Sequence, residues 1–357
     1  MIEIIHSMKE IDRTVWNNLT GRDKVETSHE WLSFAEDVNF DRKLTYCHAI
    51  HRENGDITGI LPAYYINTYL WDFAVSFGLL NLTNSLPKIK TLFKMTQIQL
   101  PLSIDSRYFG DKKHFKKCLT TLEDFSKEHH HSFLFIKNSS EKMDLPGYLC
   151  IGLFPEVYTE PYPSWDAYIQ SQDGKQGKHM RYEYKKSIEH GTKTSICEDL
   201  DGYYNVLYRM NLNITAKYKN VLVYPEYYFK KMREHLPEYT KCIFAENEGD
   251  ITGYLLLLEN DYFITCKHAG RNYQAPDPYV YFRLIYELIK YSIEKKKPIS
   301  IEKGSYKAKL RRGFKLIEKW CYIKPNYPLV GDMYLALVRK SNNKVLSRIE
   351  EIKALQK

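Results

Sequence analysis

Basic residues with catalytic potential are concentrated in the segment from Glu302 to Phe314. A predicted strand ends at Gly304, and residues 307–312 are predicted to form a short basic helix that Gly313 stops. A lysine held beside a strand end can neutralise a phosphate or stabilise the oxyanion of a tetrahedral acyl-transfer intermediate. We therefore select Lys309 as a candidate catalytic residue, and the alternative is a solvated lysine on a basic helix.

A second candidate site is the junction at residues 264–279, where a predicted strand leads into a helix. A glycine-bearing loop before a helix N-terminus offers free backbone N–H groups and the positive end of the helix dipole, which suits a pyrophosphate. We expect Ala269, Gly270 and Arg271 to contact the phosphates of a bound donor. Because the loop has a single glycine, an ordinary loop closed by prolines is the alternative.

One histidine, His268, stands near the end of the same predicted strand. Its ordinary pKa lies close to working pH, so it could remove the proton from an acceptor ammonium. Asp261 and Glu302 are weaker candidates for that role. A structural histidine is the alternative, because a lone histidine is more often structural than catalytic.

The positive charge of the chain is unevenly distributed. The net charge is +8, from 52 basic and 44 acidic residues, and two clusters concentrate it at residues 175–193 and 303–319. Such clusters fit a polyphosphate-bearing partner such as CoA, a nucleotide sugar or tRNA. We expect Arg181 and Lys307 to help bind the donor, whereas a solvated basic face is the alternative for either cluster.

Several other classes of site and location are not supported. The chain has no nucleophile elbow, P-loop, zinc-protease motif or dinucleotide fingerprint. Its histidine triplet at residues 129–131 lies at a predicted helix end, where neighbouring side chains diverge, so we expect a solvated helix end and predict no metal site. Seven cysteines without a C-x-x-C pair indicate reduced thiols and a cytoplasmic location. The first ten residues do not resemble a signal peptide, and no run is long enough to predict a membrane span.

An internal repeat divides the chain. The pentapeptide Gly-Asp-Ile-Thr-Gly occurs at residues 55–59 and again at 249–253, each time between β-like runs, as in a hairpin. In both halves the pattern predicts a helix, this hairpin with further strands, a second helix and a strand, which is a mixed α/β (α+β) layer. The predicted helices and the strands after them are 30–38, 113–129 and 132–136 in the first half, and 225–235, 279–294 and 299–301 in the second.

The proline-rich stretch between Pro155 and Pro163 is the expected boundary between the halves. This boundary divides the chain into two expected domains, residues 1–160 and 161–357. After the boundary, helical periodicity starts near Ser164, and a basic helix is predicted from Lys178 to His190.

Three segments of the second half carry a family resemblance: residues 177–191, 281–305 and 306–314. They resemble GNAT-superfamily acyltransferases related to the Fem-type peptidoglycan aminoacyltransferases. The resemblance covers about residues 160–325 and implies two tandem GNAT-like domains with the donor site in the second. It also places Lys309 where those enzymes hold a lysine beside the phosphate and the acyl-transfer centre. The chain departs from the family pattern at Ala308, where an aromatic residue is usual, and in lacking a glycine-rich pyrophosphate loop.

These observations lead to an expected function. We expect N-acyl transfer from acyl-CoA, as a donor that is not permanently bound, to a small amine-bearing acceptor. Such enzymes act mainly by positioning the reactants and stabilising an oxyanion, which explains why no stronger motif is present. Two alternatives stay open: an aminoacyltransferase of Fem type that uses aminoacyl-tRNA, and a non-catalytic protein that binds a phospho-ligand or nucleic acid on a degenerate GNAT fold.

Overall fold

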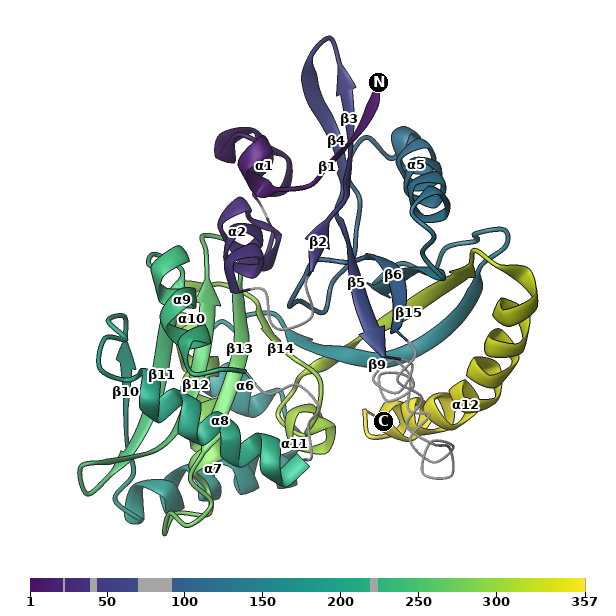
Figure 1. Ribbon diagram of the computed structural model, residues 1–357. Helices are drawn as coiled ribbons and strands as arrows, with labels where there is room; N and C mark the ends of the chain where they lie inside the picture. Colours follow the sequence, from purple (N-terminus) through teal and green to yellow (C-terminus); the bar gives the residue numbers. More distant parts are fainter. Residues whose placement is uncertain (22, 39–43, 70–91, 219–223, 357) are drawn as a thin grey trace.

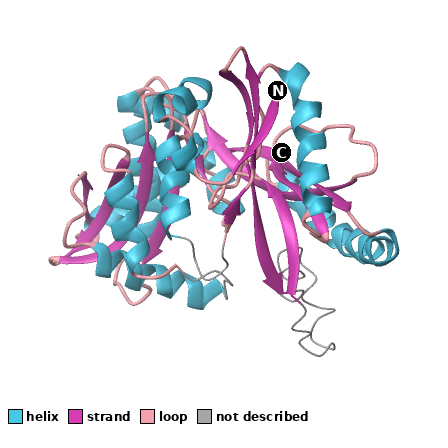
Figure 2. Ribbon diagram, turned by 45° about the horizontal axis from the view of Figure 1, so that its top comes forward, coloured by secondary structure: helices cyan, strands magenta, loops and turns pink. Residues whose placement is uncertain are grey.

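One long sheet runs through the molecule, and helices lie on both of its faces (Figures 1 and 2). The computed structural model describes residues 1–21, 23–38, 44–69, 92–218 and 224–356. In this described part, eleven strands form the long sheet in the order β10-β11-β12-β13-β14-β9-β15-β8-β6-β5-β2. A smaller sheet has the order β1-β3-β4-β7.

The first half contains the small sheet and one end of the long sheet. Its described elements are β1 (Ile2–Ile5), α1 (Arg13–Thr20), α2 (His29–Val38), β2 (Thr45–Tyr46), β3 (His48–Glu53), β4 (Asp56–Leu61), β5 (Ala63–Tyr69), β6 (Leu92–Ile98), β7 (Phe109–Gly110), α5 (Phe115–Glu128), β8 (Phe133–Ser139) and β9 (Leu149–Thr159). Short 3-10 turns η1 (Met8–Glu10), η2 (Val25–Thr27) and η3 (Lys112–His114) precede three of its helices.

The second half repeats a common order of strand, two helices, hairpin, strand, helix and two strands, and it carries additional helices. Its described elements are α6 (Trp165–Gln170), α7 (Gly174–Glu189), β10 (Lys193–Cys197), α8 (Tyr204–Tyr218), α9 (Tyr227–His235), β11 (Thr240–Asn247), β12 (Asp250–Glu259), β13 (Ile264–Arg271), α10 (Val280–Lys295), β14 (Ile299–Ile301), α11 (Tyr306–Leu310), β15 (Lys315–Pro325) and α12 (Pro328–Ala354). Each predicted helix and strand is present, with ends shifted by a few residues.

The two copies of the pentapeptide occupy equivalent hairpins, which confirms the internal repeat. Asn54 and Gly55 join β3 to β4 with φ angles of 53° and 92°, and Glu248 and Gly249 join β11 to β12 with 53° and 89°. Two successive positive φ angles are the mark of a tight type I′ turn. Both hairpins also carry a bulge two pairs beyond the turn, at the threonine of the pentapeptide.

The halves exchange strands at the centre of the long sheet. Strand β9, from before the expected boundary, pairs antiparallel with β14 of the second half. Strand β15, from the second half, pairs antiparallel with β8 of the first half, and β9 and β15 also pair with each other. The expected boundary at residue 160 falls directly after β9, so the strand that ends the first half lies beside the second.

The aliphatic run at residues 255–258 is a central strand covered on both faces. Leu255 and Leu257 pack into a core with α10, while Leu256 and Leu258 pack into the core that holds α8 and α9. Successive side chains of a strand point to opposite faces, so a strand with helices on both sides is apolar at every position. No helix of the described residues combines the length and the apolar character needed to cross a membrane.

Two local predictions need correction. The basic helix begins at Gly174 and not at Lys178, because the Asp173 carboxylate caps it by accepting from two backbone N–H groups at 2.9 Å. The histidine triplet is not wholly a solvated helix end. His131 is buried, and its Nδ1 lies 2.7 Å from the Thr96 hydroxyl, because the chain turns inward there to start β8.

Candidate active site in the second half

A cavity forms where two neighbouring strands separate. Strands β13 and β14 run parallel and pair over three positions, the last being Cys266 with Ile301. On the other side of β13 the register with β12 shifts, so that Lys267 forms a bulge. Bulges interrupt pairing and re-aim side chains, and they are frequent beside active sites. Beyond the last pair the strands enclose, with α8, α10 and α11, a cavity of about 490 Å³.

Five of the seven predicted site residues line this cavity. They are His268, Ala269, Gly270, Arg271 and Lys309. Lys307 instead lines a neighbouring cavity of about 880 Å³. Arg181 is exposed on α7 and is not among the residues that line either cavity. On a helix as short as α11, the two-residue step from Lys307 to Lys309 is enough to place the side chains on different faces.

Lys309 is a buried lysine at the edge of the first cavity. Only 3% of the residue is exposed, and its ammonium donates a hydrogen bond to the carbonyl oxygen of Glu302. Burial lowers its pKa to about 8. Gly304 and Ser305, at φ 95° and 50°, turn the chain from β14 directly into α11 and so bring Lys309 back to the strand end.

Lys303 is a second functional candidate, which the sequence placed in the basic cluster but did not single out. Its Nζ lies 2.7 Å from Oδ1 of Asn138 on β8, and it also lines the cavity. Burial, followed by repulsion from Lys137 and Lys319, lowers its pKa to about 7. The lysines that repel it come from the first half and from β15, so only the folded chain could show this shift.

The bulge residue Lys267 contacts Glu302 and groups of the first half. Its ammonium donates to the Leu102 carbonyl at 2.5 Å and pairs with Glu302, while Glu26 lies 3.8 Å away. Burial raises the pKa of Glu26. The wall of the cavity is therefore joined to the first half through charged groups.

His268 lies in an aromatic environment that keeps it neutral. Its Nε2 is 2.9 Å from the Tyr228 hydroxyl, and Tyr224, Tyr228 and Phe229 place their ring centroids 4.7–5.7 Å from its own. Burial lowers its pKa well below the usual value, and Lys267 adds to this effect. Its role as general base stays a prediction, and a low pKa makes it a weak proton acceptor at neutral pH.

The predicted pyrophosphate site already contains a carboxylate. Asp277 is fully buried before α10; its Oδ1 accepts from the Tyr279 backbone N–H at 2.7 Å, and its Oδ2 accepts from Ser187 and Thr192 at 2.6 and 2.7 Å. Arg271 donates to the carbonyls of Asp277 and Pro278, both at 3.2 Å. A second anion at this helix N-terminus would meet the negative charge of Asp277.

Lysines and arginines of the second basic cluster line the larger cavity, whereas those of the first cluster do not. Residues of α7, α11 and α12 line it, including His179, Lys307, Arg311 and Arg348. The buried Arg312 joins α11 to α7 through an ion pair with Glu183. Phe282 and Ser305 line both cavities, so the two adjoin. A single ligand that extends from one cavity into the other would therefore pass Phe282 and Ser305.

No family model and no curated protein matches the sequence. Solved structures do match the fold. FemX aligns over 90% of this chain and 96% of its own, with a TM-score of 0.57 at 10% identity. The C-terminal domain of a putative lysylphosphatidylglycerol synthetase from Agrobacterium fabrum aligns over 92% of this chain and 96% of its own, with a TM-score of 0.55 at 8% identity. L-PGS from Bacillus licheniformis aligns over 91% of this chain and 94% of its own, with a TM-score of 0.54 at 10% identity.

The chain has a tandem GNAT fold. This confirms the expected mixed α/β class with two GNAT-like units, and it confirms the relation to Fem-type proteins at the level of fold. In each GNAT unit a parallel strand pair follows the hairpin, β6 with β8 in the first and β13 with β14 in the second. The cavity with Lys309 lies at the parallel pair of the second unit.

Proposed function

We propose that this GNAT-fold protein transfers an acyl group from acyl-CoA to an amine in the cavity between β13 and β14. The observation that supports this most strongly is that two lysines line the opening, Lys309, which is buried, and Lys303, which is half-buried. Titratable groups with shifted pKa values in a cleft mark functional sites. Their two pKa values, about 7 and about 8, suit one proton acceptor and one cation.

The cavity offers each component that aminolysis needs. On the β14 side, residues 268–271 of β13 continue beyond the last strand pair, so their backbone is available to an extended amide-bearing donor. The acceptor nitrogen attacks the thioester carbonyl carbon, forming a C–N bond, and the C–S bond breaks to release the thiolate. The neutral amine of Lys303 takes the proton from the acceptor, and the ammonium of Lys309 stabilises the oxyanion.

The test is an acyl-transfer assay with the full chain. A panel of acyl-CoA donors and primary amines is incubated with the protein, and thiol release and product mass are measured. We expect amine-dependent release, lost in Lys303→Met and retained in His268→Gln. The reverse pattern would assign the proton transfer to His268, and no release with any donor would exclude acyl-CoA.

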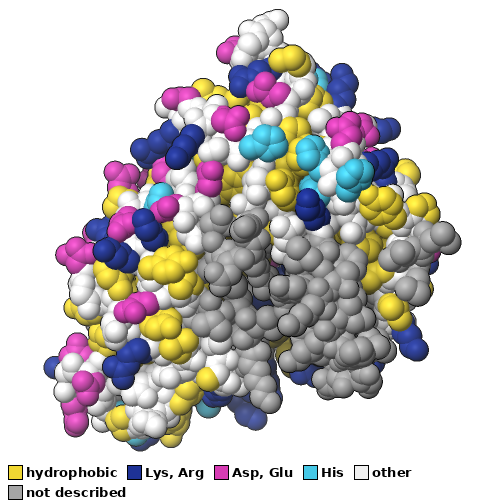
Figure 3. Space-filling model, in the orientation of Figure 1, with side chains coloured by type: hydrophobic (Ala, Val, Ile, Leu, Met, Phe, Trp, Pro, Cys, Tyr) yellow, Lys and Arg dark blue, Asp and Glu magenta, His cyan; other side chains and the backbone are white. Residues whose placement is uncertain are grey.

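A second donor, aminoacyl-tRNA, is favoured by two observations. Asp277 occupies the helix N-terminus where a pyrophosphate was expected, and the basic cavity is large enough to hold phosphates of a nucleic acid end. On the face shown in Figure 3, by contrast, basic and acidic side chains are interspersed, so this face is not a uniformly basic surface for binding tRNA. Transfer of a labelled amino acid from charged tRNA, abolished by ribonuclease, would establish this donor; binding of tRNA without transfer would favour the non-catalytic alternative.

A further inference from the structure

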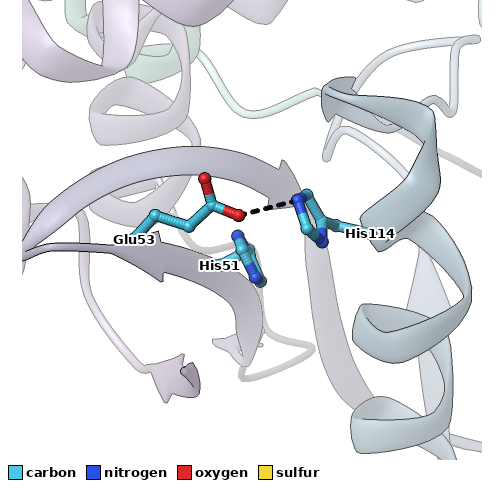
Figure 4. Close-up of side chains that lie close together, drawn as sticks. All are labelled: His51, Glu53 and His114. Atoms are coloured by element: carbon cyan, nitrogen blue, oxygen red, sulfur yellow. Dashed lines mark ion pairs between the residues drawn. The ribbon is translucent and has the colours of Figure 1, made fainter.

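Two histidines and a glutamate meet in the first half, away from the acyl-transfer cavity. His51 and Glu53 are two residues apart on β3, so both point to the same side of the strand. His114 ends the turn η3 that leads into α5. Figure 4 shows the three side chains turned toward one another across the gap between the hairpin and the helix. None of the three lines either second-half cavity.

The side chains are close enough to share one ion. One ligand atom from each residue lies within 4.8 Å of the others. The Nε2 of His114 is 3.0 Å from Oε1 of Glu53, and the two imidazole rings stack with centroids 3.7 Å apart. A tetrahedral zinc ion binds nitrogen and oxygen ligands at about 2.0–2.2 Å, so its ligands lie roughly 3.3 Å from one another. The ligand atoms therefore lie within about 1.5 Å of the spacing that a bound zinc ion requires.

His114 has unused hydrogen-bonding capacity in a buried place. Only 7% of the residue is exposed. Its Nε2 faces the Glu53 carboxylate, whereas its Nδ1 has no hydrogen-bond partner within the described part of the chain. A buried polar nitrogen without a partner costs about 1–3 kcal/mol unless something binds it. Glu53, by contrast, has a side chain that is 49% exposed, so it can adjust to an ion and leave a coordination position open to water.

His51 is already oriented for coordination. Its Nδ1 lies 2.8 Å from the hydroxyl of Thr58 on the neighbouring strand, which leaves Nε2 for a ligand. Metal-binding histidines usually donate their second N–H to such a partner.

We propose that His51, Glu53 and His114 bind one divalent transition-metal ion, zinc in the first instance, with water as the fourth ligand. Two imidazoles and one carboxylate with an open position are a ligand set that zinc accepts. The bound ion links the β3–β4 hairpin to the start of α5. This site differs from the sequence-based expectation of no metal, because its ligands are far apart in the sequence and meet only in the folded chain.

The test measures zinc in the full-length protein, purified without a metal-affinity tag, stripped with chelator, and reloaded with Zn²⁺. After desalting, elemental analysis should find one zinc per chain. His51→Gln and His114→Gln should lose it, and Thr58→Val should weaken affinity by roughly 10–100-fold in competition with a chromogenic chelator, because Thr58 acts through His51. His190→Gln is the matched control, since His190 is an exposed histidine outside the group.

Two further readouts keep the test independent of folding defects. Glu53→Gln changes a half-exposed side chain, so it should fold normally and still lose affinity. Zinc should raise the melting temperature of the unaltered chain and of His190→Gln, but not of His114→Gln, because ligand binding to the native state stabilises it. Equal zinc retention in the unaltered chain, Glu53→Gln and His114→Gln would overturn the proposal, as would no retention in the unaltered chain.

Discussion

Two lysines of one short helix experience opposite environments. Lys309 is 3% exposed and hydrogen-bonds a backbone carbonyl beside the strand end, whereas Lys307 is exposed at the other cavity. A cation in a dry site acts on a developing charge far more strongly than one in water. The local position of each lysine, and not the charge of the basic helix as a whole, therefore determines its effect on catalysis.

Removing the two charges one at a time should separate these effects. We expect Lys309→Ala to lower kcat/KM by roughly 10²–10³, the usual loss for one preorganised electrostatic group. Lys307→Ala removes the same charge and should change kcat/KM little. Lys309→Met keeps most of the side-chain volume, so an equal loss in that variant would show that packing is not the cause. Equal losses in Lys307→Ala and Lys309→Ala would reduce both residues to a general electrostatic attraction, weakened by salt.

The same lysines predict a narrow pH optimum. Lys303, with a pKa of about 7, must be neutral to accept a proton, so activity should rise with pH through 7. Lys309, with a pKa of about 8, must be charged to stabilise the oxyanion, so activity should fall as pH rises through 8. A profile of kcat/KM against pH should be bell-shaped. In Lys309→Ala the alkaline limb should disappear; its persistence would assign that limb to another group.

At the scale of elements, the two repeated hairpins differ at one turn residue. Both turns need two residues with positive φ, and the first copy uses Asn54 while the second uses Glu248. Asparagine tolerates the left-handed region far better than glutamate does. The second hairpin thus carries local strain that the first avoids, although both place glycine at the next position.

Exchanging these residues should change stability in opposite directions. Glu248→Asn should raise the free energy of unfolding by about 0.5–1 kcal/mol, and Asn54→Glu should lower it by a similar amount, because only the turn conformation is affected. Urea denaturation followed by circular dichroism measures both changes. Gly249→Ala, which puts a Cβ at φ 89°, should be destabilising and serves as the reference for turn strain. Shifts of the same sign in the two exchanged variants would contradict this explanation.

At the scale of the molecule, strand exchange makes the two halves depend on each other. Strand β9 lies between β14 and β15, and β15 lies between β9 and β8. A buried ion-pair network crosses the same region, where Glu156 on β9 contacts Lys24 of the first half and Lys319 of β15. Removing one partner of such a network typically costs about 3–5 kcal/mol. The sheet therefore acts as a single unit.

Separated halves should not fold alone. A fragment of residues 161–357 lacks β9, which leaves the edges of β14 and β15 unpaired, and exposed strand edges promote aggregation. We expect each fragment to lack native dispersion by NMR and the two to form a stable complex when co-expressed. The full chain should show one unfolding transition by fluorescence and by circular dichroism. Two resolved transitions, or a well-folded isolated half, would show that the exchange does not couple the units.

Local signals in the sequence determined the repeated units and part of the site. The turn chemistry of Gly55 and Gly249, the periodicity of the helices and the alternation of apolar residues depend on neighbours along the chain, so they could be predicted directly. The position of Lys309 after a strand end was predictable for the same reason, and so was the grouping of residues 268–271. Arg181 does not line either cavity, because the direction in which a helix face points depends on how that helix packs, and its role in binding the donor stays a prediction.

Only the tertiary structure decided the remaining features. The exchange of β9 and β15 follows from pairing between residues more than a hundred positions apart, for which the repeat carried no signal. The low pKa values of Lys303 and Lys309 arise from burial, which the fold creates and composition cannot reveal. The meeting of His51, Glu53 and His114 depends on how α5 packs against the hairpin. A site built from residues that are far apart in the sequence is determined by tertiary packing, whereas the helices and strands that carry those residues are determined by local sequence.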